Sequence, residues 1–253
     1  MKFFLVLLVA CQFACRSTNG QNSSIIKGYI IESQFPEFDT LNNEWVVKKY
    51  TPQYTRLYYY KDKIMAQPSF TYIKSNILND IILGDEQQEE RYNSFIFSKK
   101  TKLGIFCDSN SLKSARLVNK DSMLINIWVL KDELKGVFEN TIQKLTSSKV
   151  EANGDLVEEY SLVEKKDTAM KGVCILKLTK RDKDSAYYRL SPFIESTRNM
   201  KLVEYITIIN ARMYEPQHRL MNKFEMPVKV SEIRIDNQQE LLQMFDYAEK
   251  KLK

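Results

Sequence analysis

The sequence contains very little glycine and a single histidine. Glycine accounts for 7 of the 253 residues, which excludes glycine-rich phosphate loops and collagen-like repeats. One histidine, His218, cannot form the paired-histidine motifs of zinc enzymes. It is also not accompanied by a Gly-x-Ser-x-Gly segment that would carry a nucleophile. The sequence therefore predicts no catalytic triad, no metal site and no cofactor, and it favours a protein without catalytic activity.

Carboxylates are the one catalytic chemistry that this composition leaves open. Glycoside hydrolysis needs only two carboxyl groups, about 5 to 10 Å apart. A hydrolase of glycans or lipids is therefore an alternative, although no candidate stands in a distinctive sequence context. The candidates are Glu158, Glu159, Glu195, Glu204 and Glu215.

The apolar run at the start of the chain is too short to cross a membrane. Lys2 precedes the run Phe3–Ala10, and small and polar residues follow as far as Gly20. A transmembrane helix needs about 20 apolar residues, whereas this order of charge, apolar core and small residues is typical of a secretory signal peptide. Residues 1–20 are therefore predicted to be a signal peptide or lipoprotein leader. We expect the protein to be extracytoplasmic: periplasmic, an outer-membrane lipoprotein or secreted.

The four cysteines fall into two pairs with different interpretations. Cys11 and Cys15 end the apolar run, and Leu8–Cys11 resembles a bacterial lipobox, so either cysteine is a candidate for lipidation and peripheral membrane attachment. Free secretion after ordinary cleavage is the equal alternative. Cys107 and Cys174 could form a disulfide in an oxidising compartment. The sequence slightly favours buried free thiols, because nothing in it places the two side chains within bonding distance.

Positive charge is spread along the chain. The net charge is +6, and the densest basic group, Lys99–Lys102, fits a turn between strands. A nucleic-acid-binding protein would concentrate its basic residues on one face, so we expect no nucleic-acid partner.

Most of residues 21–253 alternate between apolar and polar residues, which is typical of β-strands. We predict a single β-rich domain: a curved antiparallel sheet, half-barrel or barrel-like, that ends in a helix over residues 237–252. Asn153–Gly154 predicts a hairpin turn. Asp121–Leu130 is expected to be a buried central strand, Asn76–Leu83 a turn or two of helix, residues 85–90 a solvated acidic loop, and residues 185–190 a further strand.

Tyrosine and phenylalanine are abundant, at 14 and 13 residues. Aromatic side chains on one curved sheet can line an apolar pocket, although they can equally fill the core or pair across strands. The candidate pocket residues are Tyr58, Tyr60, Tyr72, Phe97, Trp128 and Tyr188.

Two segments in the second half of the chain resemble a known family. Lys171–Cys174, followed by Ala186–Ile194, resembles part of the GLPGLI family of exported Bacteroidetes proteins, in which a Gly-x-x-Cys strand precedes a tyrosine-containing segment. The family's Leu-Pro-Gly-Leu-Ile segment is absent, and Met200–Ile206 stands near its place. The expected architecture is also similar to that of LolA-type lipoprotein carriers. This resemblance implies an exported β-rich protein, and a LolA-like one would hold acyl chains.

These observations predict an exported cell-envelope protein that binds an apolar or lipid-like ligand or another envelope component. The alternatives are the carboxylate-dependent hydrolase and a structural or assembly protein of the envelope. A bare sheet edge or a large exposed apolar patch would favour the assembly protein. The oligomeric state is left open.

Overall fold

The computed structural model describes most of the chain after the predicted leader. Described are residues 25–42, 44–78, 81–98, 100–127, 132–166, 171–180, 188–214 and 219–252. Backbone alone is described for residues 71–78, 81–90, 125–126 and 214. The predicted leader with Cys11 and Cys15, and also His218, lie outside the described residues.

The described chain is mainly β, with 60% strand and 22% helix. The strands are β1 (Lys27–Leu41), β2 (Glu44–Tyr60), β3 (Lys63–Leu78), β4 (Ile81–Tyr92), β5 (Ser94–Ser98), β6 (Leu103–Cys107), β7 (Arg116–Asn119), β8 (Thr141–Val150), β9 (Leu156–Glu164), β10 (Lys171–Lys180), β11 (Met200–Ile209), β12 (Arg212–Tyr214), β13 (Arg219–Met221) and β14 (Phe224–Ile233). The helices are η1 (Asp108–Asn110), η2 (Leu112–Ser114), α2 (Lys120–Asn126), α3 (Glu133–Asn140), α4 (Pro192–Arg198) and α5 (Gln238–Lys251).

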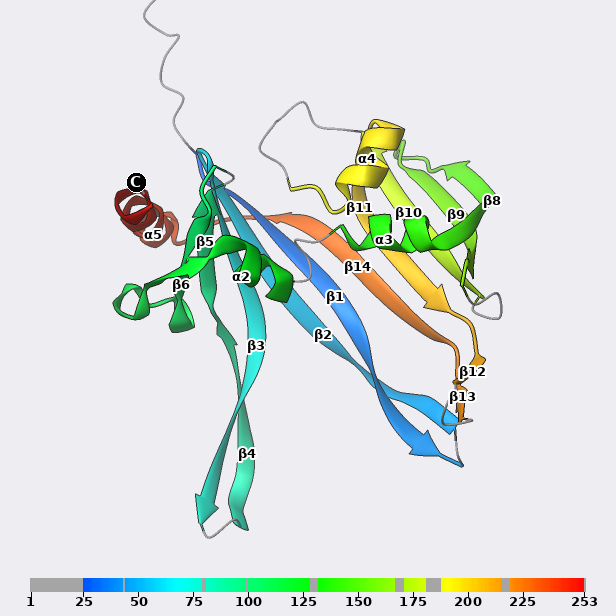
Figure 1. Cartoon of the computed structure of the whole chain (residues 1–253), viewed down its shortest axis with the longest axis horizontal. Helices are drawn as coiled ribbons and strands as arrows, with labels where there is room; N and C mark the ends of the chain where they lie inside the picture. Colours follow the sequence, from blue (N-terminus) through cyan, green and yellow to red (C-terminus); the bar gives the residue numbers. More distant parts are fainter. Residues whose placement is uncertain are drawn as a thin grey trace, which may run out of the picture.

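The strands form one curved sheet that does not close (Figure 1). Its order is β7-β6-β5-β3-β2-β1-β14-β11-β10-β9-β8, with β4 paired to β3 and β12 paired to β13. Every pair is antiparallel except the short β13–β2 pair. The predicted fold class, a curved antiparallel sheet with a C-terminal helix, is confirmed.

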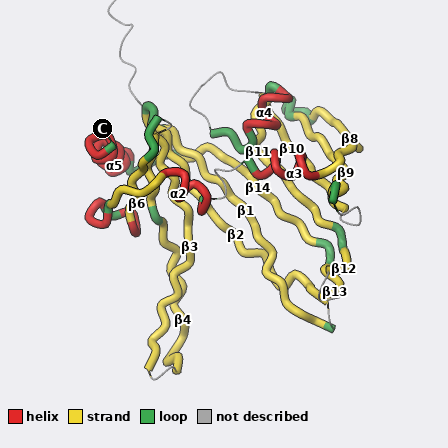
Figure 2. Tube along the Cα trace, viewed as in Figure 1, coloured by secondary structure: helices red, strands yellow, loops and turns green. Residues whose placement is uncertain are grey.

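The two faces of the sheet carry separate hydrophobic clusters, because successive side chains of a strand point to opposite faces. On β2, Leu57 and Tyr59 contribute to the larger cluster, and Tyr58 and Tyr60 contribute to the smaller one. We call these faces the groove face and the α5 face, respectively. Figure 2 shows the short helices α2, α3 and α4 apart from the longer α5.

Helix α5 covers the α5 face and confirms the predicted C-terminal helix to within a residue at each end. Its residues Leu241, Met244, Phe245 and Ala248 recur at helical spacing and are buried in the smaller cluster. Lys63 Nζ lies 3.6 Å from Glu249 Oε2, so an ion pair also joins the helix to β3.

The predicted central strand Asp121–Leu130 is wrong over its first part. Residues 120–126 form α2, and Asn119 caps this helix by accepting a hydrogen bond from Ser122 N at 3.0 Å. Met123, Leu124 and Ile127 pack against the larger cluster at helical spacing. A short apolar run fits a strand and a buried helix equally well by periodicity alone. Residues 128–130 lie outside the described part of the chain.

A long β-hairpin stands where the sequence predicted a short helix and an acidic loop. Strands β3 and β4 run through both the predicted helical turn Asn76–Leu83 and the predicted acidic loop 85–90, and pair from Ser69–Tyr92 to Leu78–Ile81. Pro68 lies where β3 changes partner from β5 to β4. Its missing N–H is tolerated there.

The structure contains the predicted turn at Asn153–Gly154 but not the described part of the strand predicted for residues 185–190. The Asn153–Gly154 turn joins β8 to β9, with Gly154 at φ +86° and its N–H donating to Glu151 O at 2.9 Å. The strand predicted for residues 185–190 is wrong where it is described, since residues 188–190 are not in a strand. Instead they lead into α4.

Candidate functional site

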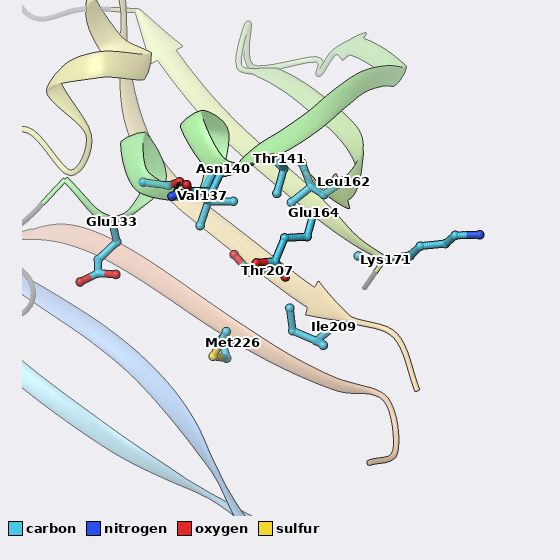
Figure 3. A pocket seen from close by; sticks show the side chains of 12 residues that line it. Glu133, Val137, Asn140, Thr141, Leu162, Glu164, Lys171, Thr207, Ile209 and Met226 are labelled. Atoms are coloured by element: carbon cyan, nitrogen blue, oxygen red, sulfur yellow. Dashed lines mark hydrogen bonds between the residues drawn. The ribbon is translucent and has the colours of Figure 1, made fainter. Parts of the chain in front are cut away.

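An apolar groove lies between α3 and the groove face of the sheet (Figure 3). It has two lobes, of about 380 and 450 Å³, which share Glu133, Val137, Thr207 and Met226. We call these lobe one and lobe two, and together the α3 groove. Small-molecule sites typically measure about 300 to 1,000 Å³, so each lobe is within the usual size range.

The two lobes extend from their shared residues toward opposite parts of the sheet. Lobe one continues between α3 and strands β9 to β11, and lobe two continues toward β1 and β2. The remaining residues of lobe one are Gly136, Asn140, Thr141, Leu162, Glu164, Lys171, Gly172 and Ile209. The remaining residues of lobe two are Ser33, Gln34, Phe35, Gln53, Leu134, Tyr205 and Val228.

Local hydrogen bonds form α3 and hold it above the sheet. Asp132 Oδ1 accepts from Lys135 N at 3.2 Å and caps the first turn. At the other end, Thr141 Oγ1 donates to Val137 O at 2.7 Å. Leu134 is the helix's buried anchor, only 1% exposed. Val137 and Phe138 also pack against the larger cluster, and the Phe138 ring contacts that of Tyr160 with centroids 5.3 Å apart. The helix therefore rests on the core along its length, and the two lobes lie beside these contacts.

The same aspartate ties α3 to α4. Ser191 Oγ donates to Asp132 Oδ1 at 2.5 Å, and Phe193 N donates to Asp132 Oδ2 at 2.9 Å. Ser191 is itself the N-cap of α4 and accepts from Ile194 N at 3.3 Å. One carboxylate thus serves the N-termini of two helices.

Two glycines line lobe one. A Cβ at Gly136 would meet nothing within 4 Å, so no neighbouring atom requires glycine in the middle of this helix. Glycine there costs about 0.5–1 kcal/mol relative to alanine. A Cβ at Gly172 would lie 2.6 Å from the Ile208 carbonyl oxygen. A side chain at Gly172 would therefore push β10 and β11 apart.

The larger hydrophobic cluster disfavours ionisation of the groups buried in it. Burial raises the pKa of Cys174 to about 12, against a small opposing effect of its hydrogen bond with Thr207, so the thiol is neutral at physiological pH. Burial also raises the pKa of Tyr59, Tyr188 and Tyr205 far above the usual value of 10.0. These groups pack in the core as neutral hydroxyls and a neutral thiol.

The predicted aromatic pocket is not the α3 groove. Tyr58 and Tyr60 belong to the α5 face, whereas Phe97 and Tyr188 belong to the groove face. No described residue of the predicted set lines either lobe. The side chain of Tyr72 and the whole of Trp128 lie outside the described residues.

The sequence missed the groove because most of its lining is aliphatic or small. Val137, Thr207 and Met226 are unremarkable in sequence and come from three separate elements. Gly136 was the one local signal, since glycine inside a helical segment needs a reason.

Cys107 and Cys174 are both free and buried. They belong to different hydrophobic clusters, on opposite faces of the sheet. A disulfide between them, one of the two interpretations of the sequence, is therefore absent from the structure. Burial also raises the pKa of Cys107.

Two carboxylates that were candidates for the hydrolase alternative are held by hydrogen bonds within the fold. Arg198 Nε donates to Glu158 Oε2 at 2.9 Å, and the Tyr160 hydroxyl donates to the same oxygen at 2.8 Å. Glu195 is fully buried, and its Oε1 accepts from Leu190 N at 3.0 Å. Both carboxylates fasten α4 or the segment before it. Glu215 lies outside the described residues.

The described residues contain no cluster of three or more histidine, cysteine, aspartate or glutamate residues that could hold a metal ion. No helix within the described ranges has the length and apolar character needed to cross a bilayer.

The fold and groove together define a class: an open, curved antiparallel sheet with three short helices on one face and an apolar groove beneath one of them. No protein-family model, no curated protein and no solved structure matches the chain. The resemblance to the GLPGLI family stays a prediction.

Proposed function

We propose that this is an exported cell-envelope protein that binds an apolar or lipid-like ligand in the α3 groove, without catalysing a reaction. The observation that carries the proposal is the pair of adjacent apolar lobes between α3 and the sheet, which share part of their lining. Binding an apolar chain there would remove apolar surface from water at about 25 cal/mol per Å². The leader-like residues 1–20 support export.

Binding of a neutral apolar dye tests this function. Diphenylhexatriene fluoresces when it leaves water, so the protein should enhance its fluorescence saturably. Val137 lines both lobes, and the larger side chain of Val137→Trp would reduce the space in each. We expect this variant to lose at least about tenfold in dye affinity, equivalent to about 1.4 kcal/mol.

A matched tryptophan variant controls for nonspecific effects. Ile142 lies on the edge strand β8 and is 60% exposed, outside both lobes. Ile142→Trp should keep the affinity of the unmodified protein. Equal dye binding by both variants would place the dye elsewhere and refute the proposal.

A role in assembly is the second candidate, and strand β8 favours it. This strand lies at the end of the sheet order and exposes Ile142, Leu145 and Val150. An exposed apolar edge is a template for pairing with another chain. Sedimentation of the unmodified protein and of Leu145→Lys would distinguish this candidate, because assembly through β8 requires the first to associate and the second not to.

A further inference from the structure

The hairpin of β3 and β4 has an unpaired edge along β4. From Ser69 to Leu78, β3 pairs with β4 alone among the described strands, because its pairing with β2 and β5 has ended by Pro68. β4 in turn has no other strand partner in the described part of the chain. Figure 1 shows the hairpin extending away from the rest of the sheet. An isolated two-stranded hairpin is only marginally stable in water, so a third strand beside β4 would stabilise it.

A second unpaired edge is that of β8, the last strand in the sheet order. Every residue from Lys144 to Val150 is exposed, so no described element covers either face of this part of the strand. The strand at the other end of the order, β7, has only 4 residues, against 10 in β8. Of the two terminal edges, β8 is therefore the longer template for an incoming strand.

The edges of β4 and β8 carry opposite charge. β8 contains Lys144 and Lys149 and no acidic residue, whereas four of the six residues 85–90 in β4 are aspartate or glutamate. Both lysines lie on one face of the sheet, because they pair with Ser161 and Val157 of β9, which are an even number of residues apart. Neither lysine forms an ion pair with a described residue. Their charge is therefore available to an approaching strand.

Like charge disfavours the pairing of either edge with itself. Two β8 strands side by side would bring lysines together, and two β4 strands would bring carboxylates together. Like charges opposite each other on paired strands are destabilising, whereas opposite charges are stabilising. Lysine on an edge strand is also a common protection against self-pairing. A β4 strand beside β8 is therefore the combination of these two edges that charge favours.

We infer that β4 of one molecule pairs with β8 of a second copy of this chain and extends its sheet, an inference that rests on the assembly role proposed above. The two edges are too far apart to pair within one molecule, since β2, β1, β14, β11, β10 and β9 separate β3 from β8 (Figure 1). The backbone groups of both edges supply the hydrogen bonds, and the charges select the partner. Because the two edges differ, the contact is head-to-tail and builds rings or open chains of molecules.

Charge reversal on each edge tests this pairing. The β8 variant carries Lys144→Glu with Lys149→Glu, and the β4 variant carries Glu89→Lys with Glu90→Lys. Sedimentation velocity over a range of protein concentrations measures the association. We expect the unmodified protein to associate, and each variant alone to associate at least about tenfold more weakly, because each then has two edges of like charge.

A matched control reverses two lysines away from both edges. Lys48 and Lys113 are exposed and lie outside β4 and β8. Lys48→Glu with Lys113→Glu changes the net charge as much as the β8 variant does, and should associate like the unmodified protein. Equal weakening in the control and in the β8 variant would show an effect of net charge alone and overturn the inference.

Both reversals combined in one chain provide the decisive variant. The charges of the two edges are then exchanged, so association should recover. A combined variant that associates as weakly as the β4 and β8 variants would overturn the inference. If the β4 variant does not fold, Glu89→Gln with Glu90→Gln serves, and it should also weaken association.

The outcomes separate this inference from the proposed functions. Weak association of the β8 variant with unchanged association of the β4 variant would overturn the inference and leave assembly through β8 standing. An unmodified protein that stays monomeric at every concentration would remove both. Neither β4 nor any of the four reversed positions lines the α3 groove, so dye binding tests the groove separately, and all variants should keep the dye affinity of the unmodified protein.

Discussion

The Arg198–Glu158 ion pair joins the last residue of α4 to strand β9. Glu158 is 8% exposed and its partner Arg198 is 37% exposed, so the pair bridges core and surface. The Arg198 guanidinium also donates to the Tyr160 hydroxyl, and the bond to Glu158 raises the arginine's pKa. Removing the arginine would leave a largely buried carboxylate without its cation.

We predict that Arg198→Ala lowers the free energy of unfolding by about 1–3 kcal/mol, less than for a fully buried pair because water can reach the site. Urea unfolding measures the change. Arg234→Ala is the control: Arg234 also pairs with a carboxylate, that of Asp236, but is 94% exposed. Its loss should cost under about 0.5 kcal/mol. Equal losses for the two variants would contradict this account.

The helices on the groove face depend on capping interactions that the sequence reveals only in part. Asn119 could have been recognised as an N-cap before Met123 and Leu124, and would have corrected the predicted strand over 121–130. The interaction of Asp132 with α4 could not, because its partners Ser191 and Phe193 lie about sixty residues away in sequence. Contacts of this kind depend on tertiary structure, which local periodicity does not encode.

Because Asp132 both caps α3 and binds α4, we predict that its loss destabilises the protein more than the loss of a simple helix cap. Asn119→Ala removes the cap of α2 alone and should cost about 1 kcal/mol. Asp132→Ala removes the cap of α3 and its link to α4, and should cost about 2–3 kcal/mol. It should also weaken dye binding, because α3 roofs the groove. Thermal unfolding and dye titration measure both effects. Equal costs with unchanged dye affinity would show that the link does not position α3.

At the scale of the whole molecule, the alternation of residues correctly predicted a curved antiparallel sheet, and apolar residues at helical spacing correctly predicted its terminal helix. The alternation did not predict how the aromatic residues are distributed between the two faces of the sheet. Tyr58 and Tyr60 alternate with Leu57 and Tyr59 along β2, and the two pairs point to opposite faces. The sequence cannot indicate which face carries the groove until the positions of α3 and α5 are known.

The buried tyrosines predict that the whole fold is sensitive to alkali. Burial raises the pKa of Tyr59, Tyr188 and Tyr205 above that of an unfolded tyrosine, about 10. Below pH 10 both states hold these protons, so the stability they support is fully present. Above pH 10 only the unfolded state releases them, and stability falls by about 1.4 kcal/mol per pH unit for each tyrosine.

Urea unfolding from pH 8 to pH 11 measures this dependence. Tyr59→Phe removes one of the three hydroxyls and should make the alkaline decline shallower. A stability that stays level up to pH 11, or a decline unchanged in this variant, would contradict the burial of these side chains.

The central claim is that the α3 groove holds an apolar chain, and a crystal structure of the protein with decanol tests it most directly. We predict continuous alkyl density between Val137 and Met226. Side chains filling this space, or a ligand bound only on the α5 face, would contradict it.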